Sequence, residues 1–297
     1  MKYDVYTPLL LSLLLAVVSP VIGGRMAPAL AARVLTSAAV LTAAATTWSL
    51  ILLATALVGD APPVVREARE DGHPLTDPVP EVIGIAACLA LAVVCRRVHR
   101  ALRAQFRTRR ALHRLCAGHP ADTELIVAAS PLPQAFAIPG RPGRILVTSA
   151  MLGALQPAER RVLLAHERAH LTHRHGLLVT AATLAATANP LLAPVRTTVT
   201  FLVERWADER AADAVGDRTA TARALARAAL TARRPRPACA LNFTERAVTR
   251  RIAALQTSPP PRLWSAAVAV LALGALPALL AADATNDLYQ LLAGVLT

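Results

Sequence analysis

The sequence predicts a mainly α-helical membrane protein, in which a bundle of transmembrane helices carries a cytosolic α+β domain with a small sheet. Of its 297 residues, 55% are hydrophobic and only 17% are charged, with a mean hydropathy of +0.44. This composition is more hydrophobic and less charged than that of ordinary soluble proteins, as is typical of membrane proteins. Long uncharged runs also alternate with charged segments along the chain. This composition excludes a disordered or fibrous protein.

Four uncharged runs are predicted to cross the membrane. The first, Thr7–Gly24, could also be interpreted as a cleavable signal peptide. Its weakly basic flank and the lack of a clear A-x-A cleavage site favour a retained helix. The second, Val34–Gly59, and the fourth, Leu263–Ala282, each supply the roughly 20 residues that a span needs. The third, Val82–Cys95, is shorter than the usual span.

The distribution of charge orients these spans. The connection 60–81 carries six acidic residues and two arginines, whereas Arg96–Arg114 holds eight arginines and no acid. Because arginine-rich loops stay in the cytosol, we place Arg96–Arg114 on that side. This predicts a membrane domain (1–95), a cytosolic domain (96–262) and a C-terminal span with a short tail (263–297).

The net charge of +13 points to an anionic partner. Arg96–Arg114 adjoins a predicted span and holds a single Phe (Phe106) rather than a series of interleaved aromatic residues, so we expect it to contact anionic lipid and expect no direct nucleic-acid binding. The four cysteines form no CxxC pair and fit no disulfide framework. We therefore expect reduced, structural thiols.

A helix predicted over Gln156–Gly176 contains the strongest chemical signal in the chain. Its His-Glu-Arg-Ala-His segment is an HExxH match. On a helix, His166 and His170 project from one face and can share a metal ion, while Glu167 can reach a metal-bound water. The competing interpretation is a charged helix whose histidines are merely solvated.

A catalytic zinc ion needs a third protein ligand. The HExxHxxGxxH extension is excluded, because His173 and Gly176 stand at its Gly and third His positions. Downstream, FLVERWADERAADAVGDR places Glu204 and Asp208 on one helical face. Glu204 can then ligate the metal while Asp208 accepts a hydrogen bond from a ligating imidazole. Alone, this segment would be an ordinary salt-bridged surface helix.

Four nearby residues are not expected to bind the metal. His173 falls near the HExxH face at helical spacing, but such histidines are more often solvated, and we interpret His175 in the same way. Glu209 and Asp213 are also expected to be solvated.

The stretch PQAFAIPGRPGRILVTSAMLGALQPAERRVLLAHERAH, read with the later ExxAD helix, resembles the gluzincin membrane peptidases. The resemblance covers about Glu124–Asp217 and favours the BlaR/MecR-type branch over the related HtpX/Ste-type proteases. It implies a zincin-like metallopeptidase domain that holds one Zn²⁺ per chain. By this resemblance the metal ligands are His166, His170 and Glu204, and the catalytic residues are Glu167, as base, and Asp208.

Two features depart from the resembled family. Gln134 stands where its pattern usually has Asn, and no penicillin-binding sensor domain is recognisable. The resemblance implies a protein or peptide substrate at the cytosolic membrane face, with a cytosolic transcriptional repressor as one candidate. An HtpX-like quality-control protease and a non-catalytic membrane sensor or scaffold are the alternatives.

Two further segments constrain the fold. Residues Glu124–Ser130 and Ala135–Thr148 are predicted strands around a turn at Ile138-Pro139-Gly140. The uncharged run Gly176–Val195 is long enough to span, but a single crossing would put His170 and Glu204 on opposite sides of the membrane. Because Asn189-Pro190 interrupts it, we predict two short helices that pack on the domain or enter the membrane and return.

Overall fold

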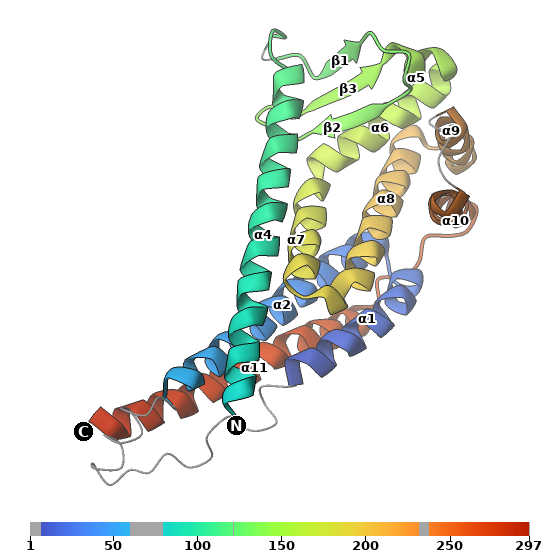
Figure 1. The fold of residues 1–297 in the computed structure, drawn as a ribbon. Helices are drawn as coiled ribbons and strands as arrows, with labels where there is room; N and C mark the ends of the chain where they lie inside the picture. Colours follow the sequence, from blue (N-terminus) through green and yellow to red (C-terminus); the bar gives the residue numbers. More distant parts are fainter. Residues whose placement is uncertain (1–6, 60–79, 121, 232–237, 297) are drawn as a thin grey trace.

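The computed structural model describes residues 7–59, 80–120, 122–231 and 238–296 (Figure 1). Helices dominate, and a small sheet lies at one end of the molecule. The elements in chain order are α1 (Thr7–Arg25), α2 (Pro28–Gly59), α4 (Glu81–Leu115), β1 (Leu125–Ala128), β2 (Ala135–Ile138), β3 (Arg144–Thr148), α5 (Ser149–Ala154), α6 (Pro157–Thr172), α7 (His175–Ala188), the short 3₁₀ helix η1 (Pro190–Leu192), α8 (Ala193–Val215), α9 (Arg218–Thr231), α10 (Ala238–Leu255) and α11 (Trp264–Leu296).

Three described helices are long and apolar enough to cross a membrane, namely α1, α2 over Pro28–Thr55, and α4. They contain the first three predicted spans. The fourth predicted span lies within α11, whose described apolar part, Trp264–Leu279, is shorter. The acidic connection at 60–79 lies outside the described residues.

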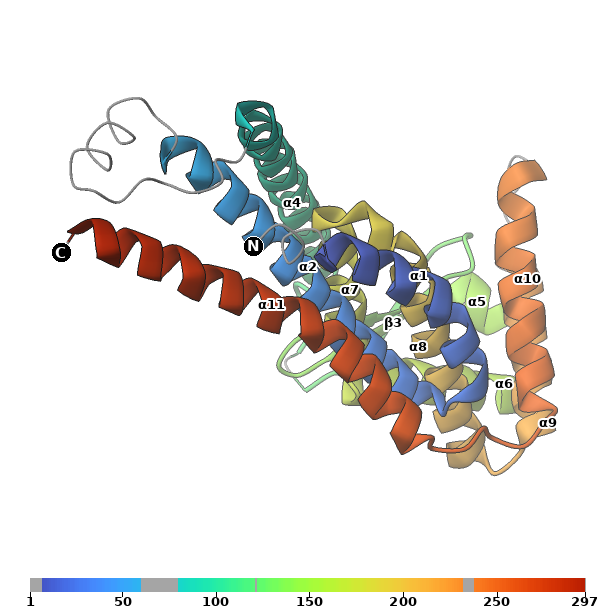
Figure 2. The same cartoon turned by 90° about the horizontal axis from the view of Figure 1, so that it is seen from below.

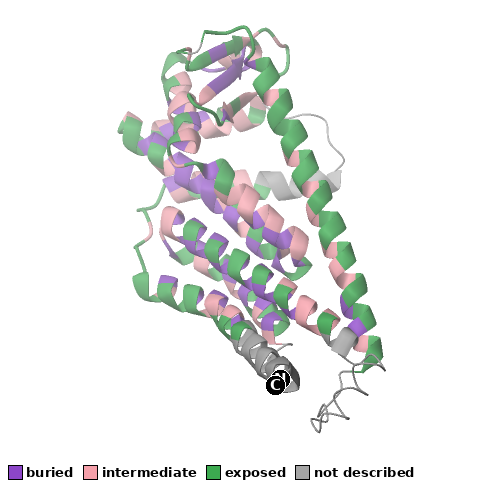
Figure 3. Ribbon diagram, turned by 90° about the vertical axis from the view of Figure 1, so that its left-hand side faces the viewer, coloured by how far each residue is buried: buried purple, intermediate pink, exposed green. Residues whose placement is uncertain are grey.

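Helix α4 joins two segments that the sequence analysis treated separately. The third predicted span and the arginine-rich stretch form one continuous 35-residue helix. Its sequence contains no proline and a single glycine, Gly84, so no residue breaks the backbone hydrogen bonds of the helix. The domain boundary predicted at residue 95 therefore falls inside a helix. Apolar residues such as Val82 and Leu89 on this helix are largely exposed (Figure 3), as expected for lipid contact.

Small residues let the helices of the membrane part pack closely. Helix α11 runs beside α2 (Figure 2), and a Cβ atom added at Gly274 would lie only 2.5 Å from the Cα atom of Ala38. Such close backbone approach is typical of helix packing in membranes. A Cβ at Gly23 in α1 would similarly meet Thr198 of α8 at 2.8 Å.

The uncharged run after Gly176 forms a helical hairpin. Helix α7 leads away from the sheet, the chain turns at Asn189-Pro190, and α8 returns (Figure 1). Its apolar residues, among them Ala185, Leu192 and Val199, are buried in one cluster with residues of α1, α2 and α11. The predicted return is therefore observed, but the second arm is a helix of 23 residues rather than a short one.

A polar contact fixes the tip of this hairpin. The Asn189 side chain is 3% exposed. Its Nδ2 donates to Ser12 Oγ in α1 at 2.7 Å and to Thr46 Oγ1 in α2 at 3.1 Å. Its Oδ1 accepts from the backbone N–H of Leu191 at 3.1 Å. The tip is thus hydrogen-bonded to two candidate membrane helices at once.

The sheet has the order β1-β3-β2, with β1 parallel and β2 antiparallel to β3. Alternate residues of β3 face opposite sides. Leu146 packs with Ile126 and Cys116 near the end of α4, whereas Ile145 and Val147 pack with Met151 and with leucines of α6. The predicted strands are present, and the sheet anchors α6.

Candidate metal centre

The helix that carries the HExxH segment, α6, is well capped at its N-terminus and ends before the predicted residue. Pro157 is its first residue, and the Glu159 carboxylate accepts from the Gln156 backbone N–H at 2.8 Å, which completes a capping box. The helix ends at Thr172, so the predicted end at Gly176 was wrong. Arg174 adopts a left-handed conformation with φ of 53°, and this residue redirects the chain into α7.

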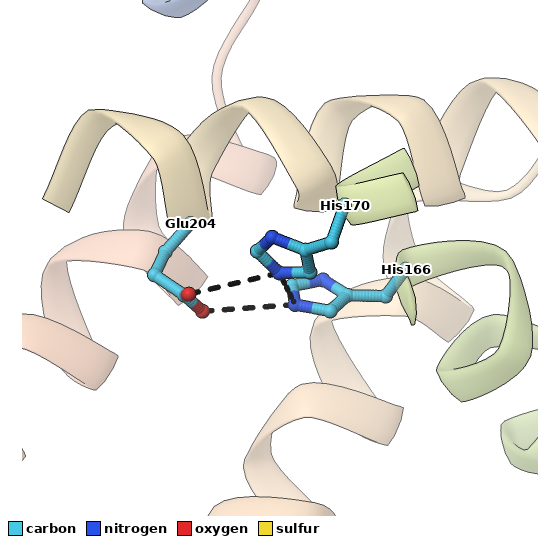
Figure 4. Close-up of side chains that lie close together, drawn as sticks. All are labelled: His166, His170 and Glu204. Atoms are coloured by element: carbon cyan, nitrogen blue, oxygen red, sulfur yellow. Dashed lines mark hydrogen bonds and ion pairs between the residues drawn. The ribbon is translucent and has the colours of Figure 1, made fainter. Parts of the chain in front are cut away.

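His166, His170 and Glu204 converge between α6 and α8 (Figure 4). The two Nε2 atoms lie 3.1 Å apart. Each lies 3.6 Å from a different Glu204 carboxylate oxygen. The α7–α8 hairpin brings Glu204 back to α6 because α8 returns beside α7 after the turn at Asn189-Pro190 (Figure 1). A single crossing by Gly176–Val195 is thereby excluded.

Asp208 lies behind His166, one helical turn after Glu204. Its Oδ1 is 3.1 Å from His166 Nδ1, and its side chain is 4% exposed. Arg251 of α10 donates to both Asp208 oxygens at 2.7 Å and lies 3.0 Å from Glu204. The guanidinium therefore orients both acidic residues of α8 at once.

Glu167 is next to the first histidine and is 9% exposed. The backbone N–H of Ala137 in β2 hydrogen-bonds its carboxylate. The structure thus brings together all five predicted site residues and sets the edge of the sheet beside Glu167.

A sequence profile of peptidase family M48 matches residues 99–263, more than half of the chain. The chain belongs to peptidase family M48. Membership in this peptidase family agrees with the predicted peptide hydrolase, and the match does not distinguish the BlaR/MecR-type from the HtpX/Ste-type branch. No curated protein and no solved structure matches the chain.

The charges in this M48 site favour a bound cation. Burial lowers the pKa of His166, but hydrogen bonds to Asp208 and Glu204 outweigh it and raise that pKa to about 10. Burial raises the pKa of Glu204, yet His166 and Arg251 hold it below its ordinary value. For His170, burial and the charge of His166 lower the pKa to about 4. Because the rings are so close, only one of them is the positively charged imidazolium, and the other stays neutral.

The M48 site also fits a metal by donor type and spacing. Two imidazole nitrogens and a carboxylate are preferred zinc ligands. A tetrahedral ion with bonds of about 2.0–2.1 Å places its ligands about 3.3 Å apart, close to the observed 3.1 and 3.6 Å. The carboxylates of Asp208 and Glu204, which stabilise the positive charge of protonated His166, would also stabilise a divalent cation.

Glu167, the predicted base, has a distinct environment in this M48 site. Burial raises the pKa of Glu167, and the charge of Glu204 acts in the same direction, while the charge of His166 opposes it. A carboxylate whose pKa is raised toward neutrality accepts and returns a proton more readily.

Sequence reasoning missed Arg251 and assigned no role to His175. The Nδ1 atom of His175 lies 3.0 Å from Nδ1 of His170, and the residue is 1% exposed. A histidine five positions after the second ligand was the available signal. His173 stacks on Trp206, and Glu209 pairs with Arg218 instead of being solvated.

Proposed function

We propose that this chain is a zinc-dependent endopeptidase that hydrolyses peptide bonds at the cytosolic face of a membrane. The observation that carries the proposal is the convergence of His166, His170 and Glu204 from two helices, with Glu167 buried beside them. Family membership supports peptide hydrolysis. The donor set supports zinc as the metal.

The side chains divide the chemistry between them. A zinc ion held by His166, His170 and Glu204 would polarise the scissile carbonyl and activate the attacking water. The Glu167 carboxylate takes a proton from that water and passes it to the leaving amine. Asp208 holds the Nδ1 proton of His166, which leaves Nε2 free as a ligand. Arg251 keeps Asp208 and Glu204 ionised and oriented.

The edge of the sheet supports binding of an extended peptide. Thr148 N–H donates to Gln134 C=O, so the ladder bonds between β2 and β3 belong to residues 134, 136 and 138. The backbone groups of Ala135 and Ala137 point to the opposite side of this edge strand, where Ala137 already meets Glu167. A substrate strand added there would gain affinity from main-chain hydrogen bonds with little sequence preference.

The membrane setting rests on α1, α2 and α4. The exposed arginines of α4 continue directly from its apolar half, and this continuity supports contact with anionic headgroups. Substrates are then proteins that reach the membrane surface. Cleavage of a cytosolic repressor would assign the enzyme to signalling, and broad cleavage of unfolded membrane proteins would assign it to quality control.

The test compares Glu167→Gln with the wild-type full-length chain in detergent. The variant should keep about one zinc per chain and lose casein hydrolysis by at least about 100-fold, because general acid–base catalysis is removed while the ligands stay. Glu124→Gln is the matched control, since Glu124 forms only a surface ion pair with Arg168. Wild-type activity in Glu167→Gln, or folded wild-type protein that binds no zinc, would refute the proposal.

A further inference from the structure

The predicted ligand His170 makes a second contact on the side of its ring away from Glu204. Its Nδ1 atom lies 3.0 Å from Nδ1 of His175, the first residue of α7. Two imidazole nitrogens at this distance form a hydrogen bond only when one carries a proton and the other a lone pair. The direction of this bond therefore depends on which nitrogen of His170 is protonated.

The position of Glu204 decides that direction. His170 Nε2 is the nitrogen that faces Glu204 and His166. A nitrogen that binds a metal must offer its lone pair, so the proton of neutral His170 is on Nδ1. His175 Nδ1 then accepts this proton in a hydrogen bond, and His175 carries its own proton on Nε2.

We propose that His175 is a positioning residue that accepts the Nδ1–H of His170 and thereby fixes the tautomer and ring orientation of this metal ligand. The inference rests on the proposed zinc site. Metal-ligating histidines generally donate their other N–H to an acceptor, and loss of that acceptor weakens metal binding. His166 has such an acceptor in Asp208, and His175 gives His170 the equivalent partner.

The surroundings of His175 suit this role. The ring lies 4.5 Å from the Trp206 ring, centroid to centroid, and Arg33 of α2 lies over Trp206 at the same distance. Among the described residues, His175 Nε2 has no hydrogen-bond partner. A buried polar atom without a partner lowers stability, which an apolar ring at this position would avoid. Contact with His170 explains why an imidazole occupies the position.

The two histidine ligands, His166 and His170, would then donate their Nδ1–H groups to different kinds of acceptor. The partner of His166 is a carboxylate bound by Arg251, whereas the partner of His170 is a neutral imidazole. A neutral acceptor orients the ring without adding another negative charge to a site that already holds Glu204, Asp208 and Glu167.

The test measures zinc affinity of the full-length chain by competition with a chelator. His175→Phe keeps an aromatic ring but removes the acceptor, and should weaken zinc binding by about 10–100-fold. His175→Asn places an amide oxygen near the position of Nδ1 and should stay close to wild type. His175→Ala, measured in parallel, should lose affinity like the Phe variant, so the outcome does not depend on one variant folding.

His173→Phe is the matched control, because His173 stacks on the same Trp206 ring and should leave zinc affinity unchanged. Wild-type affinity in a folded Phe or Ala variant would overturn the inference. Equal losses in the Asn and Phe variants would also overturn it, since packing would then be the cause. Absence of zinc from the wild-type chain would instead refute the proposed function, which separates the two failures.

Discussion

The two ends of the α7–α8 hairpin are held by different chemistry. Near the sheet, Arg251 binds Asp208 and Glu204 in a buried ionic network. At the tip, Asn189 joins Ser12 and Thr46 through neutral hydrogen bonds inside an apolar cluster. Ionised groups are retained only where opposite charges compensate for lost hydration, and the proposed metal would add to this compensation. Among membrane helices, uncharged groups provide specificity at lower cost.

Removing a proposed metal ligand should have the largest effect, because it weakens the ionic end of the hairpin directly. Glu204→Ala takes away one of three donors, so zinc affinity should fall by more than about 100-fold, beyond the loss typical of outer-partner substitutions. Chelator competition measures the change. Asp213→Ala is the control, since Asp213 is mostly exposed and pairs with Arg210. Unchanged zinc affinity in Glu204→Ala would remove this residue from the site.

Arg251→Leu should separate the contribution of the ionic network to protein stability from the contribution of bound zinc. Removing one partner of a buried ion pair costs about 3–5 kcal/mol. We therefore expect the free energy of unfolding of chelator-treated protein to fall by this amount. Bound zinc replaces part of the missing positive charge, so the loss should be smaller in zinc-loaded protein.

Thermal unfolding with and without chelator measures both values for Arg251→Leu. Arg250→Leu is the matched control, because Arg250 lies over the Phe201 ring and is exposed. Equal destabilisation with and without zinc would show that Arg251 does not compensate the same charges as the metal.

Asn189→Leu tests the neutral end. The variant loses hydrogen bonds to Ser12 and Thr46, but both hydroxyls keep their bonds to backbone carbonyls. Interhelical hydrogen bonds in membranes contribute about 0.6 kcal/mol each, so we expect the free energy of unfolding to fall by about 1 kcal/mol. A double-mutant cycle with Ser12→Ala measures the Asn189–Ser12 part, and a coupling energy near zero would contradict the contact.

Arg33→Gln should have the smallest effect. It removes a cation–π contact with Trp206, about 4.5 Å from the ring, which is worth about 0.5–1 kcal/mol. The unfolding midpoint should fall by roughly 1–3 °C. Arg223→Gln, on the exposed face of α9, should not change it. A midpoint equal to that of the control would mean that α2 does not support the Trp206 stack.

The sequence predicted the parts of the site that follow from local periodicity. HExxH spacing placed His166, Glu167 and His170 on one helix, and the four-residue step between Glu204 and Asp208 placed both carboxylates on one face. Asn189-Pro190 indicated the return of the chain. Each of these inferences needs only helix geometry and a proline.

Arg251 and His175 depend on tertiary structure and could not be found in this way. Arg251 is one of many arginines, and it reaches Asp208 only through the path of α9 and α10 across 43 residues. His175 would face away from His170 if the helix continued. The left-handed residue Arg174 turns the chain back and brings it into contact. The length of α4 was missed because charge, rather than a helix breaker, defined the predicted boundary.

The length of α7 has a consequence for the choice of cleavage site. Its 14 residues separate the proposed metal site from the Asn189 contact by about 21 Å at 1.5 Å per residue. Where α1 and α2 cross a membrane, the hairpin would hold the proposed active site at a fixed distance from the Asn189 contact. A membrane-anchored substrate would be cut at a fixed distance from its own anchor, and lengthening the linker beside that anchor would move the cut along the sequence.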